Sequence, residues 1–337
     1  MSGLRIGVAG ATGAVGEELL RLLSERNVPV GELRLLASAR STGRSLDWNG
    51  AALPVQELTD AALKDLDLCF FSCGGERSLR FAPVARDAGA IVIDNSSAFR
   101  MDPAVPLVIP EINPEAVDTH TGIVAVPNCT TIIFLMAAAP LHREAGLTRC
   151  VVSSYQAASG AGRAAMEEYD AQVQAVAAQK EPAAAVFPDV LHGNVIPHVD
   201  SFLPDGHTKE ERKLADESRK ILGAPALRVA ATCVRVPVRR AHSVSAALEF
   251  QRPLSPERAR EILGQAPGVV VVDGDDPTQY PTPLRVSGRS ETYVGRLRAD
   301  TSCPGGLLLW CVGDQLLKGA ALNAVQIAEI LIQRGHV

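Results

Sequence analysis

Cys129 is the residue whose setting in the sequence points most directly to chemistry. It lies in the segment Val126-Pro127-Asn128-Cys129-Thr130-Thr131, directly before an apolar run, 132–139, that we expect to be helical. Free backbone N–H groups and the helix dipole at a helix N-terminus favour a thiolate. Because the thiolate is the nucleophilic form of cysteine, the pattern predicts a covalent acyl intermediate on Cys129. A cysteine that only packs beside a helix start would show the same local pattern, so other segments must decide.

Two further segments place polar side chains directly after predicted strands. Arg100 closes the segment 94–100, and Gln156 supplies an amide in the glycine-containing segment 155–162. Side chains at strand ends of an α/β fold gather at one edge of the sheet, where ligands bind. We therefore expect both residues near a cleft.

Charged pairs distinguish two more segments. Glu210 and Lys213 are i,i+3 neighbours, so they share one face of a predicted helix. The segment 235–243 places three arginines and a histidine in one strand–turn–strand: Arg235, Arg239, Arg240 and His242. These residues also have an ordinary interpretation, as a helix-face salt bridge and as arginines in surface ion pairs. We expect that interpretation to hold for Arg239 or Arg240.

A glycine-rich loop predicts a dinucleotide site. Gly10-Ala11-Thr12-Gly13-Ala14-Val15-Gly16 follows a predicted strand and opens a predicted helix. Glycines allow the tight turn and let backbone N–H groups approach a pyrophosphate at the helix N-terminus. The predicted contacts are Gly10, Thr12, Gly13, Ala14, Val15 and Gly16.

The end of the next predicted strand indicates which dinucleotide binds. NAD-binding chains usually place a carboxylate there for the ribose 2′-hydroxyl. The segment 37–43 has no carboxylate, but it has a guanidinium and three hydroxyls, from Ser38, Arg40, Ser41 and Thr42. These donors suit a 2′-phosphate, so the cofactor predicted is NADP. The alternative is that Arg40 is a solvated loop cation.

The elements that must position these residues divide into two sets. Predicted strands at 6–9, 33–37, 68–72 and 91–94 alternate with helices, beginning with 17–23, and indicate a parallel, doubly wound sheet. After Cys129 we predict strands at 151–155, 227–236, 243–250, 269–272 and 307–312, and helices at 163–179, 210–222 and 255–265. That pattern favours an α+β domain on a largely antiparallel sheet.

The closing segment, 316–333, reads as an amphipathic helix that packs back on the first domain. We therefore predict a discontinuous NADP-binding Rossmann-type domain, 1–127 with 315–337, and a catalytic and dimerisation domain, 128–314. The fold class is α/β.

Composition excludes several kinds of partner. The 337 residues carry 33 basic and 38 acidic side chains, a formal charge of −5, which gives no reason to expect nucleic acid or an anionic membrane. The longest apolar run is too short to cross a bilayer. Seven cysteines without a C-x-x-C pair suggest neither a disulfide framework nor a metal site. We expect a reducing, cytoplasmic setting.

Taken in order, these segments resemble the aspartate-β-semialdehyde dehydrogenases. The resemblance covers nearly the whole chain and rests on GATGAVG, SARSTG, DNSSAFR, PNCTT, YQAASGAG, NVIPHVDSF, RVPVRRAHS and LLKGAALNAVQIAE. It implies a Rossmann domain joined to a dimerising α/β domain, and a homodimer, with a tetramer left open. It also implies the NADPH-dependent reduction of aspartyl phosphate to aspartate semialdehyde, with phosphate released, on the route to lysine, threonine and methionine.

The resemblance implies a role for each polar residue. Cys129 is the nucleophile, and His242 takes the thiol proton and later protonates the sulfur or the oxyanion. The substrate contacts implied are Gln156 for the carbonyl, Arg235 for the α-carboxylate, Glu210 for the α-ammonium, and Arg100 with Lys213 for the phosphate. Such a set suits a substrate with a carboxylate, an ammonium and a phosphate. Asn128, or the backbone N–H of Cys129, is expected to stabilise the oxyanion.

Further cofactor contacts follow from the same resemblance: Ser72, Gly74, Ser159, Gly160 and Gln315. Gln315 stands where the family often has asparagine, and its amide is expected to contact the nicotinamide carboxamide. Cys73 stands where alanine is common, and we consider it a second reactive thiol near the cofactor.

Two alternatives stay open. An N-acetyl-γ-glutamyl-phosphate reductase shares the acyl-phosphate chemistry, but its substrate has an acylated amine, which gives Glu210 no ammonium to bind. A catalytically inactive regulatory paralogue should have lost its nucleophile or its base, whereas this chain keeps Cys129 and His242.

Overall fold

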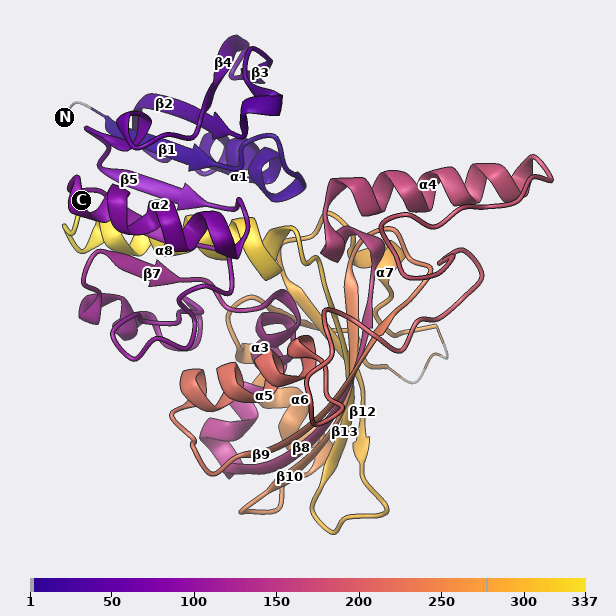
Figure 1. Cartoon of the computed structure of the whole chain (residues 1–337). Coiled ribbons are helices and arrows are strands. Elements are labelled where there is room, and N and C mark those ends of the chain that lie inside the picture. The colour runs from indigo at the N-terminus through magenta and orange to yellow at the C-terminus, as the bar shows by residue number, and fades with distance from the viewer. Residues whose placement is uncertain (1–2, 275, 277) are drawn as a thin grey trace. The chain divides into compact units, whose positions relative to one another are not determined.

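The computed structural model describes residues 3–274, 276 and 278–337, which form two compact units (Figure 1). The first unit comprises residues 1–128 with 320–337, and the second comprises residues 129–319. The sequence-based boundaries were 127/128 and 314/315. Residues 315–319 lie in the second unit, where the backbone N–H groups of Leu317 and Gly319 both donate to the carbonyl of Asp314.

The first unit is built on a seven-stranded sheet in the order β3-β4-β2-β1-β5-β6-β7, in which every pair is parallel except β3–β4. Its strands are β1 (Leu4–Ala9), β2 (Val30–Ala37), β3 (Ser45–Trp48), β4 (Ala51–Glu57), β5 (Leu68–Phe71), β6 (Ile91–Asp94) and β7 (Ile123–Ala125). Its helices are α1 (Ala14–Glu25), α2 (Gly75–Asp87) and α8 (Leu322–Gln333), with short η1 (Ala39–Ser41), η2 (Ala61–Leu63) and η3 (Pro114–Thr119).

Helices cover both faces of this sheet. The crossovers β1–α1–β2 and β5–α2–β6 run in opposite directions along the sheet, and right-handed crossovers then place α1 and α2 on opposite faces. α8 packs against α1 and β6, as predicted for the closing helix. β5 and β6 are buried at every residue, which is expected of central parallel strands.

The second unit holds a six-stranded sheet in the order β11-β12-β13-β10-β8-β9. Its strands are β8 (Leu147–Gln156), β9 (Arg228–Arg235), β10 (His242–Phe250), β11 (Val269–Val271), β12 (Thr292–Ala299) and β13 (Leu307–Gly313). Its helices are α3 (Cys129–Ala145), α4 (Arg163–Ala177), α5 (Lys209–Leu222), α6 (Pro256–Gln265) and α7 (Pro283–Val286), with a short η4 (Ala158–Ala161). A π-helical segment, η5, spans Leu317–Ala321.

The central pairs of this sheet are antiparallel, whereas the outer pairs, β8–β9 and β11–β12, are parallel. The sheet is therefore largely antiparallel, as expected, with one parallel pair at each edge. Parallel neighbours need a long crossover, and both outer pairs have one: α4 and α5 lie between β8 and β9 in the chain, and α7 lies between β11 and β12.

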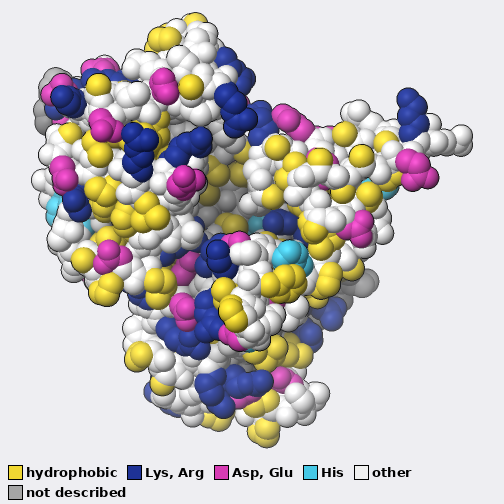
Figure 2. Space-filling model, in the orientation of Figure 1, with side chains coloured by type: hydrophobic (Ala, Val, Ile, Leu, Met, Phe, Trp, Pro, Cys, Tyr) yellow, Lys and Arg dark blue, Asp and Glu magenta, His cyan; other side chains and the backbone are white. Residues whose placement is uncertain are grey.

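One face of the mixed sheet is covered by α3, α5 and α6, while α4 extends away from it (Figure 1). β8 shows this division, because Cys150, Val152 and Ser154 are buried while the alternate residues Val151 and Tyr155 are exposed. Figure 2 shows charged side chains of both signs interspersed with hydrophobic ones on the visible face. In the part of the chain that the structure describes, no helix is both long and apolar enough to cross a bilayer.

Two features of the fold differ from the expected elements. β3, β4, β7 and β12 were not predicted; in β12 a register shift after Gly295 and a positive φ of 55° at Arg296 break the alternation. The predicted continuous helix 316–333 was wrong in its first part, because η5 precedes α8. Gly319 lies in η5, and a Cβ there would come within 2.9 Å of the Cβ of Cys129.

Candidate active site

Cys129 is the first residue of α3, which confirms the predicted helix start. The α3 residues that follow, from Thr130 to Ala139, are all buried, so the N-terminus of α3 is anchored in the core. Cys129 itself is partly exposed. This combination offers a helix N-terminus at an accessible sulfur, the setting in which a thiolate is favoured.

The other thiols are placed differently. Burial raises the pKa of Cys73 to about 11, and it raises the pKa values of Cys150, Cys233 and Cys311 to about 12. Burial also raises the pKa of Cys69. These five side chains are therefore protonated thiols at neutral pH, and the expectation that Cys73 is a second reactive thiol is not supported.

Gln156 is the last residue of β8, and its buried amide contacts α5. Its Nε2 donates to Oγ of Ser154 at 3.1 Å and to Oε1 of Glu210 at 3.2 Å. Glu210 is 5% exposed near the start of α5, where Thr208 and Glu211 form a capping box. The capping box fixes the first turn of the helix and hence the position of Glu210.

Lys213 lies one turn further along α5 and joins two carboxylates. Its Nζ donates to Oε2 of Glu210 at 3.2 Å and to Oδ2 of Asp200 at 2.6 Å. The Glu210–Lys213 contact was expected from the i,i+3 spacing. Asp200 was not singled out from the sequence, because it lies in a loop thirteen positions before Lys213 and no local pattern links the two.

Arg235 ends β9 and is 6% exposed. Its NH1 donates to the backbone carbonyl of Ala157 at 2.7 Å. Burial lowers the pKa of Arg235, and the charges of Glu210, Cys129 and Cys233 oppose that shift. The guanidinium is therefore close enough to interact electrostatically with both the sulfur and the α5 carboxylate.

His242 begins β10 and is completely buried. Its Nδ1 accepts a hydrogen bond from the backbone N–H of Ala157 at 3.1 Å, so the neutral ring carries its proton on Nε2. Nε2 has no hydrogen-bond partner among the described residues. Burial, and then the charge of Arg235, lowers the pKa of His242 well below its usual value. The ring thus offers an N–H donor to the site rather than an acceptor.

Gly160 explains how these two side chains come so close to the η4 backbone. A Cβ at Gly160 would lie 2.8 Å from Cε1 and Nε2 of His242 and 2.9 Å from NH1 of Arg235. Only a residue without a side chain leaves both groups where they are. The sequence placed Gly160 among the cofactor contacts, whereas the structure places it against His242 and Arg235.

Gln315 and Ser159 are also brought together in the second unit. Nε2 of Gln315 donates to Oγ of Ser159, and Oε1 accepts from the backbone N–H of Ala241 at 3.0 Å. Both ends of the Gln315 amide thus have protein partners. The expected contact with a nicotinamide would require the Gln315 amide to give up a hydrogen bond to Ser159 or to Ala241.

The first unit contains the glycine loop. Gly10 has φ of +93°, and a Cβ there would lie 2.2 Å from the carbonyl oxygen of Ser72. A Cβ at Gly16 would lie 2.3 Å from the carbonyl oxygen of Gly10. Gly13 caps α1, whose first residues are Ala14 and Val15. The loop therefore has the tight, side-chain-free form that a pyrophosphate cradle needs.

The residues expected to bind a 2′-phosphate lie beside this loop. Oγ1 of Thr12 donates to Oγ of Ser41 at 3.5 Å, which joins the loop to η1. Ser38 is the N-cap of η1 and Thr42 is its C-cap. Arg40 is exposed within η1, and Gly74, with φ of +89°, caps α2. The hydroxyl groups and the Arg40 guanidinium are of the kind that can donate to a phosphate.

Arg100 and Asn128 belong to the first unit too, and both are buried. Nε of Arg100 donates to the carbonyl of Val126 at 2.9 Å, and NH2 donates to the carbonyl of Asn95 at 2.8 Å. Arg100 thus braces the loop that leads into Cys129, a role the sequence did not predict. Among the described residues there is no cluster of three or more potential metal-ligating side chains.

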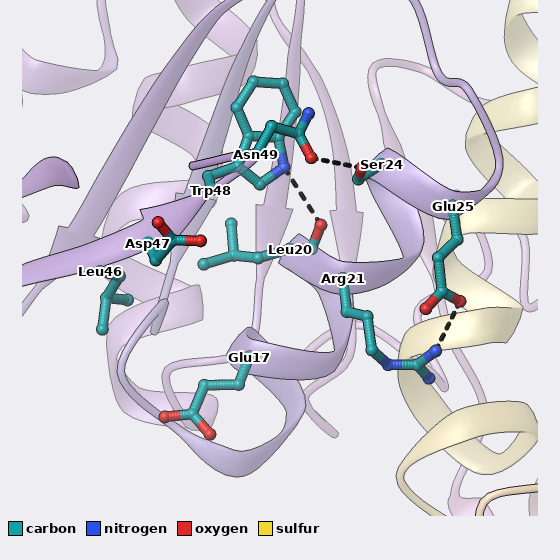
Figure 3. Close-up of a pocket in the computed structure, with 9 residues that line it drawn as sticks. All are labelled: Glu17, Leu20, Arg21, Ser24, Glu25, Leu46, Asp47, Trp48 and Asn49. Carbon is teal, nitrogen blue, oxygen red and sulfur yellow. Dashed lines mark hydrogen bonds and ion pairs between the residues drawn. The ribbon is translucent and has the colours of Figure 1, made fainter. Parts of the chain in front are cut away.

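A groove in the first unit lies apart from all these residues, between α1 and the β3–β4 hairpin (Figure 3). Several of its polar groups are paired with each other. Nε1 of Trp48 donates to the carbonyl of Leu20 at 3.2 Å, Ser24 donates to Asn49 at 2.5 Å, and Arg21 donates to Glu25 at 2.5 Å. We assign no ligand to it.

Comparison with known proteins decides the family. Residues 5–120 match the semialdehyde dehydrogenase NAD binding domain, and residues 138–318 match the semialdehyde dehydrogenase dimerisation domain. The aspartate-semialdehyde dehydrogenase of Synechocystis sp. is 49% identical over 99% of both chains, and that of Bacillus subtilis is 43% identical over 98% of this chain and 97% of the relative. The chain belongs to the aspartate-semialdehyde dehydrogenase family.

Solved structures of aspartate-semialdehyde dehydrogenases agree with this. Aspartate semialdehyde dehydrogenase II from Vibrio cholerae, solved in complex with ASA, is 40% identical, covers 99% of both chains and superimposes with a TM-score of 0.95. A second structure of the same protein also gives a TM-score of 0.95, at 41% identity over 98% of this chain and 99% of the other. The expected fold class, a Rossmann-type domain with an α+β dimerisation domain, is confirmed, and the chain is an oxidoreductase of this family.

Proposed function

We propose that this protein reduces L-aspartyl-4-phosphate to L-aspartate-4-semialdehyde with NADPH and releases phosphate, through a thioester on Cys129. The observation that carries the proposal is the placement of the Cys129 sulfur at the N-terminus of α3, within electrostatic reach of Arg235. The names of the relatives support the aspartyl substrate over the N-acetylglutamyl alternative.

The cofactor belongs to the first unit, which we propose as the NADP-binding domain. Gly10, Thr12, Gly13, Ala14, Val15 and Gly16 would hold the pyrophosphate, and Ser38, Arg40, Ser41 and Thr42 the 2′-phosphate. The fit rests on the tight turn of the loop, in which a Cβ at Gly10 or Gly16 would clash with the backbone carbonyl of Ser72 or of Gly10. Ser72 and Gly74 would border the same cradle. Bound NADPH supplies the hydride that reduces the thioester.

The second unit supplies the covalent chemistry. The thiolate of Cys129 attacks the acyl carbon, the carbon–oxygen bond to phosphate breaks, and phosphate leaves with the bonding electrons. After reduction the tetrahedral oxyanion collapses, the carbon–sulfur bond breaks and the thiolate is restored. The one proton consumed overall ends on the released phosphate.

His242 and Asn128 would stabilise the oxyanions of these steps. Because Nδ1 of His242 is occupied by the Ala157 N–H, Nε2–H is available as a donor without prior protonation of the ring. A neutral imidazole donor of this kind needs the low pKa that burial produces. The thiol proton would then leave by another route, since this tautomer offers no acceptor to the sulfur.

Recognition of the substrate follows from charge. Arg235 keeps donors beyond the NH1–Ala157 hydrogen bond and would hold the α-carboxylate in a bidentate geometry. Glu210 would bind the α-ammonium, with Gln156 orienting the carbonyl between them. Arg100 and Lys213 would hold the phosphate, which requires Asp200 to share or release Lys213.

We also propose that the second unit forms a homodimer through the open face of its sheet. Val151 and Tyr155 are each 37% exposed on this face, and the ring of Tyr155 lies 5.4 Å from that of Trp310. The match of residues 138–318 to a dimerisation domain supports dimerisation through this unit. Sedimentation of the Val151→Arg variant and of the wild type tests this interface. We expect the variant to shift to the mass of a monomer, and an unchanged mass would contradict the proposal.

The activity is tested by phosphate-dependent reduction of NADP with aspartate semialdehyde. Wild type should turn over, and Cys129→Ala should lose nearly all activity while still binding NADP. Turnover of N-acetylglutamate semialdehyde in preference to aspartate semialdehyde would favour the alternative reductase. A folded wild type that binds NADP but reduces it with neither aldehyde would indicate an inactive paralogue.

A further inference from the structure

The backbone immediately before His242 has an unusual conformation. Ala241 has φ of +74°, in the left-handed region, and it is completely buried. A non-glycine residue there is strained and persists only when its surroundings hold it in place. Because His242 follows directly, the conformation of Ala241 determines the direction in which the imidazole leaves the chain.

The last residue of β13 and the two residues after it, 313–315, contact residues 240–242. Gly313 lies opposite His242 in the antiparallel pairing of β13 with β10. Asp314 accepts a hydrogen bond from Nε of Arg240 at 2.6 Å. Gln315 accepts one from the N–H of Ala241 at 3.0 Å.

Asp314 is the fixed centre of this arrangement. Its side chain is completely buried, and Oδ2 also accepts from the backbone N–H of Gly288 at 2.7 Å, while Oδ1 accepts from the N–H of Leu316 at 3.0 Å. The guanidinium of Arg240 and the backbone N–H groups of Gly288 and Leu316 therefore converge on one carboxylate. The ion pair with Arg240 is buried on the Asp314 side, and breaking such a pair is costly because it leaves a buried charge uncompensated.

We propose that Asp314 is a positioning residue that, through Arg240, holds Ala241 in its left-handed conformation and so aims Nε2 of His242 at the reacting carbonyl. This inference rests on the proposed function of His242. Gln315 acts with Asp314, since the same amide ties Ala241 to Ser159 beside Gly160. Asp314 does not touch the substrate; it acts through the backbone of residues 240–242.

The neighbouring arginine offers a matched control. Arg239 pairs with Asp170 through Nε at 2.9 Å, but both side chains are substantially exposed, at 53% and 39%. Asp170→Asn removes one surface ion pair from the same turn, and exposed pairs of this kind contribute little to stability. Asp314→Asn makes the same chemical change in the buried pair.

The experiment compares kcat and KM of Asp314→Asn, Asp170→Asn and wild type in phosphate-dependent NADP reduction. We expect kcat of Asp314→Asn to fall about tenfold or more, since small misplacements of a catalytic group have effects of this size. KM for NADP and for aspartate semialdehyde should stay within about twofold of wild type by the same argument. Asp170→Asn should match wild type.

A second substitution that restores kcat would separate a positioning role of Asp314 from a general loss of protein stability. Glycine adopts positive φ without strain, so adding Ala241→Gly to Asp314→Asn should restore part of the lost kcat. If Asp314→Asn does not fold, Arg240→Lys, which keeps the charge but not the Nε geometry, takes its place. A normal kcat in the folded variant, an equal loss in Asp170→Asn, or a loss confined to KM for NADP would overturn the inference.

A measurement that does not depend on enzymatic turnover tests this inference separately from the proposed function. In ¹⁵N-histidine NMR, the His242 ring should show a neutral Nε2–H tautomer in the wild type whether or not the protein is active. In Asp314→Asn the His242 ring signals should shift, whereas Asp170→Asn should leave them unchanged. Unshifted signals in Asp314→Asn would contradict positioning even if wild type were inactive with every aldehyde tested.

Discussion

The backbone N–H of Ala157 donates a hydrogen bond to Nδ1 of His242 at 3.1 Å, and the carbonyl of Ala157 accepts one from NH1 of Arg235 at 2.7 Å. One residue, directly after β8, therefore fixes the two side chains that β9 and β10 supply. The contact with His242 also selects the ring tautomer. Because the contacts are made by the backbone, the identity of Ala157 gives no sign of them in the sequence.

Gly160→Ala should damage catalysis more than stability. The new Cβ would lie 2.8 Å from the His242 ring and 2.9 Å from Arg235, and both groups would have to move. We expect kcat to fall about tenfold or more. Gly264→Ala, where a Cβ meets nothing within 4 Å, is the control and should leave kcat unchanged. Equal activities of the two variants would show that the close approach is not needed.

Arg235→Lys should weaken both binding and rate. A lysine keeps the charge but replaces a bidentate fork with a point charge, and it must also replace the hydrogen bond to Ala157. We expect kcat/KM for aspartate semialdehyde to fall by about two orders of magnitude, with the Kd for NADP unchanged. Steady-state kinetics and NADP titration measure both. A near-normal Arg235→Lys would place the carboxylate elsewhere.

The buried His242 should make the protein less stable in acid. Its pKa lies well below the usual value in the folded protein and returns to it on unfolding, so below about pH 6.5 the unfolded chain binds the extra proton. Stability therefore falls as the pH drops, by up to about 1.4 kcal/mol per pH unit, and is unaffected above about pH 7. Urea unfolding of wild type and His242→Gln at pH 7 and 5 measures this. Equal losses of the free energy of unfolding between pH 7 and pH 5 in both proteins would contradict this prediction.

Arg40→Ser should change cofactor preference. Arg40 is exposed in η1. The hydrogen bond from Thr12 to Ser41 joins the glycine loop to η1. Removing its charge should raise the KM for NADP by about tenfold or more, and leave the KM for NAD within about twofold, because NAD lacks the 2′-phosphate. Arg44→Ser, two positions beyond Thr42, is the control for a general loss of positive charge. Similar changes with both cofactors would argue against a 2′-phosphate contact.

The sequence predicted those parts of the fold and of the candidate site that depend on local patterns. β6 has the expected bounds, and α3 starts at Cys129 as expected. Each of these depends on residues a few positions apart. Local reasoning therefore reached the elements and the residue types that carry the chemistry.

Contacts between distant segments were not predictable in this way. Arg240 is 74 positions from Asp314, and nothing in either segment indicates that they pair. The π-helical turn at Gly319 likewise reflects its close approach to Cys129 rather than any local helix-breaking pattern. Tertiary packing decides such features, and it is also what fixed the tautomer of His242 and the partners of Gln315.

The central claim is that the sulfur of Cys129 carries the aspartyl group. Acylation needs no hydride, so enzyme mixed with aspartyl phosphate alone, quenched in acid and digested, should show an aspartyl thioester by peptide mass spectrometry. The adduct is predicted on the peptide that contains Cys129, and it should be absent from Cys129→Ala. An adduct on another side chain, or no adduct from an enzyme preparation that turns over once NADPH is added, would contradict the account.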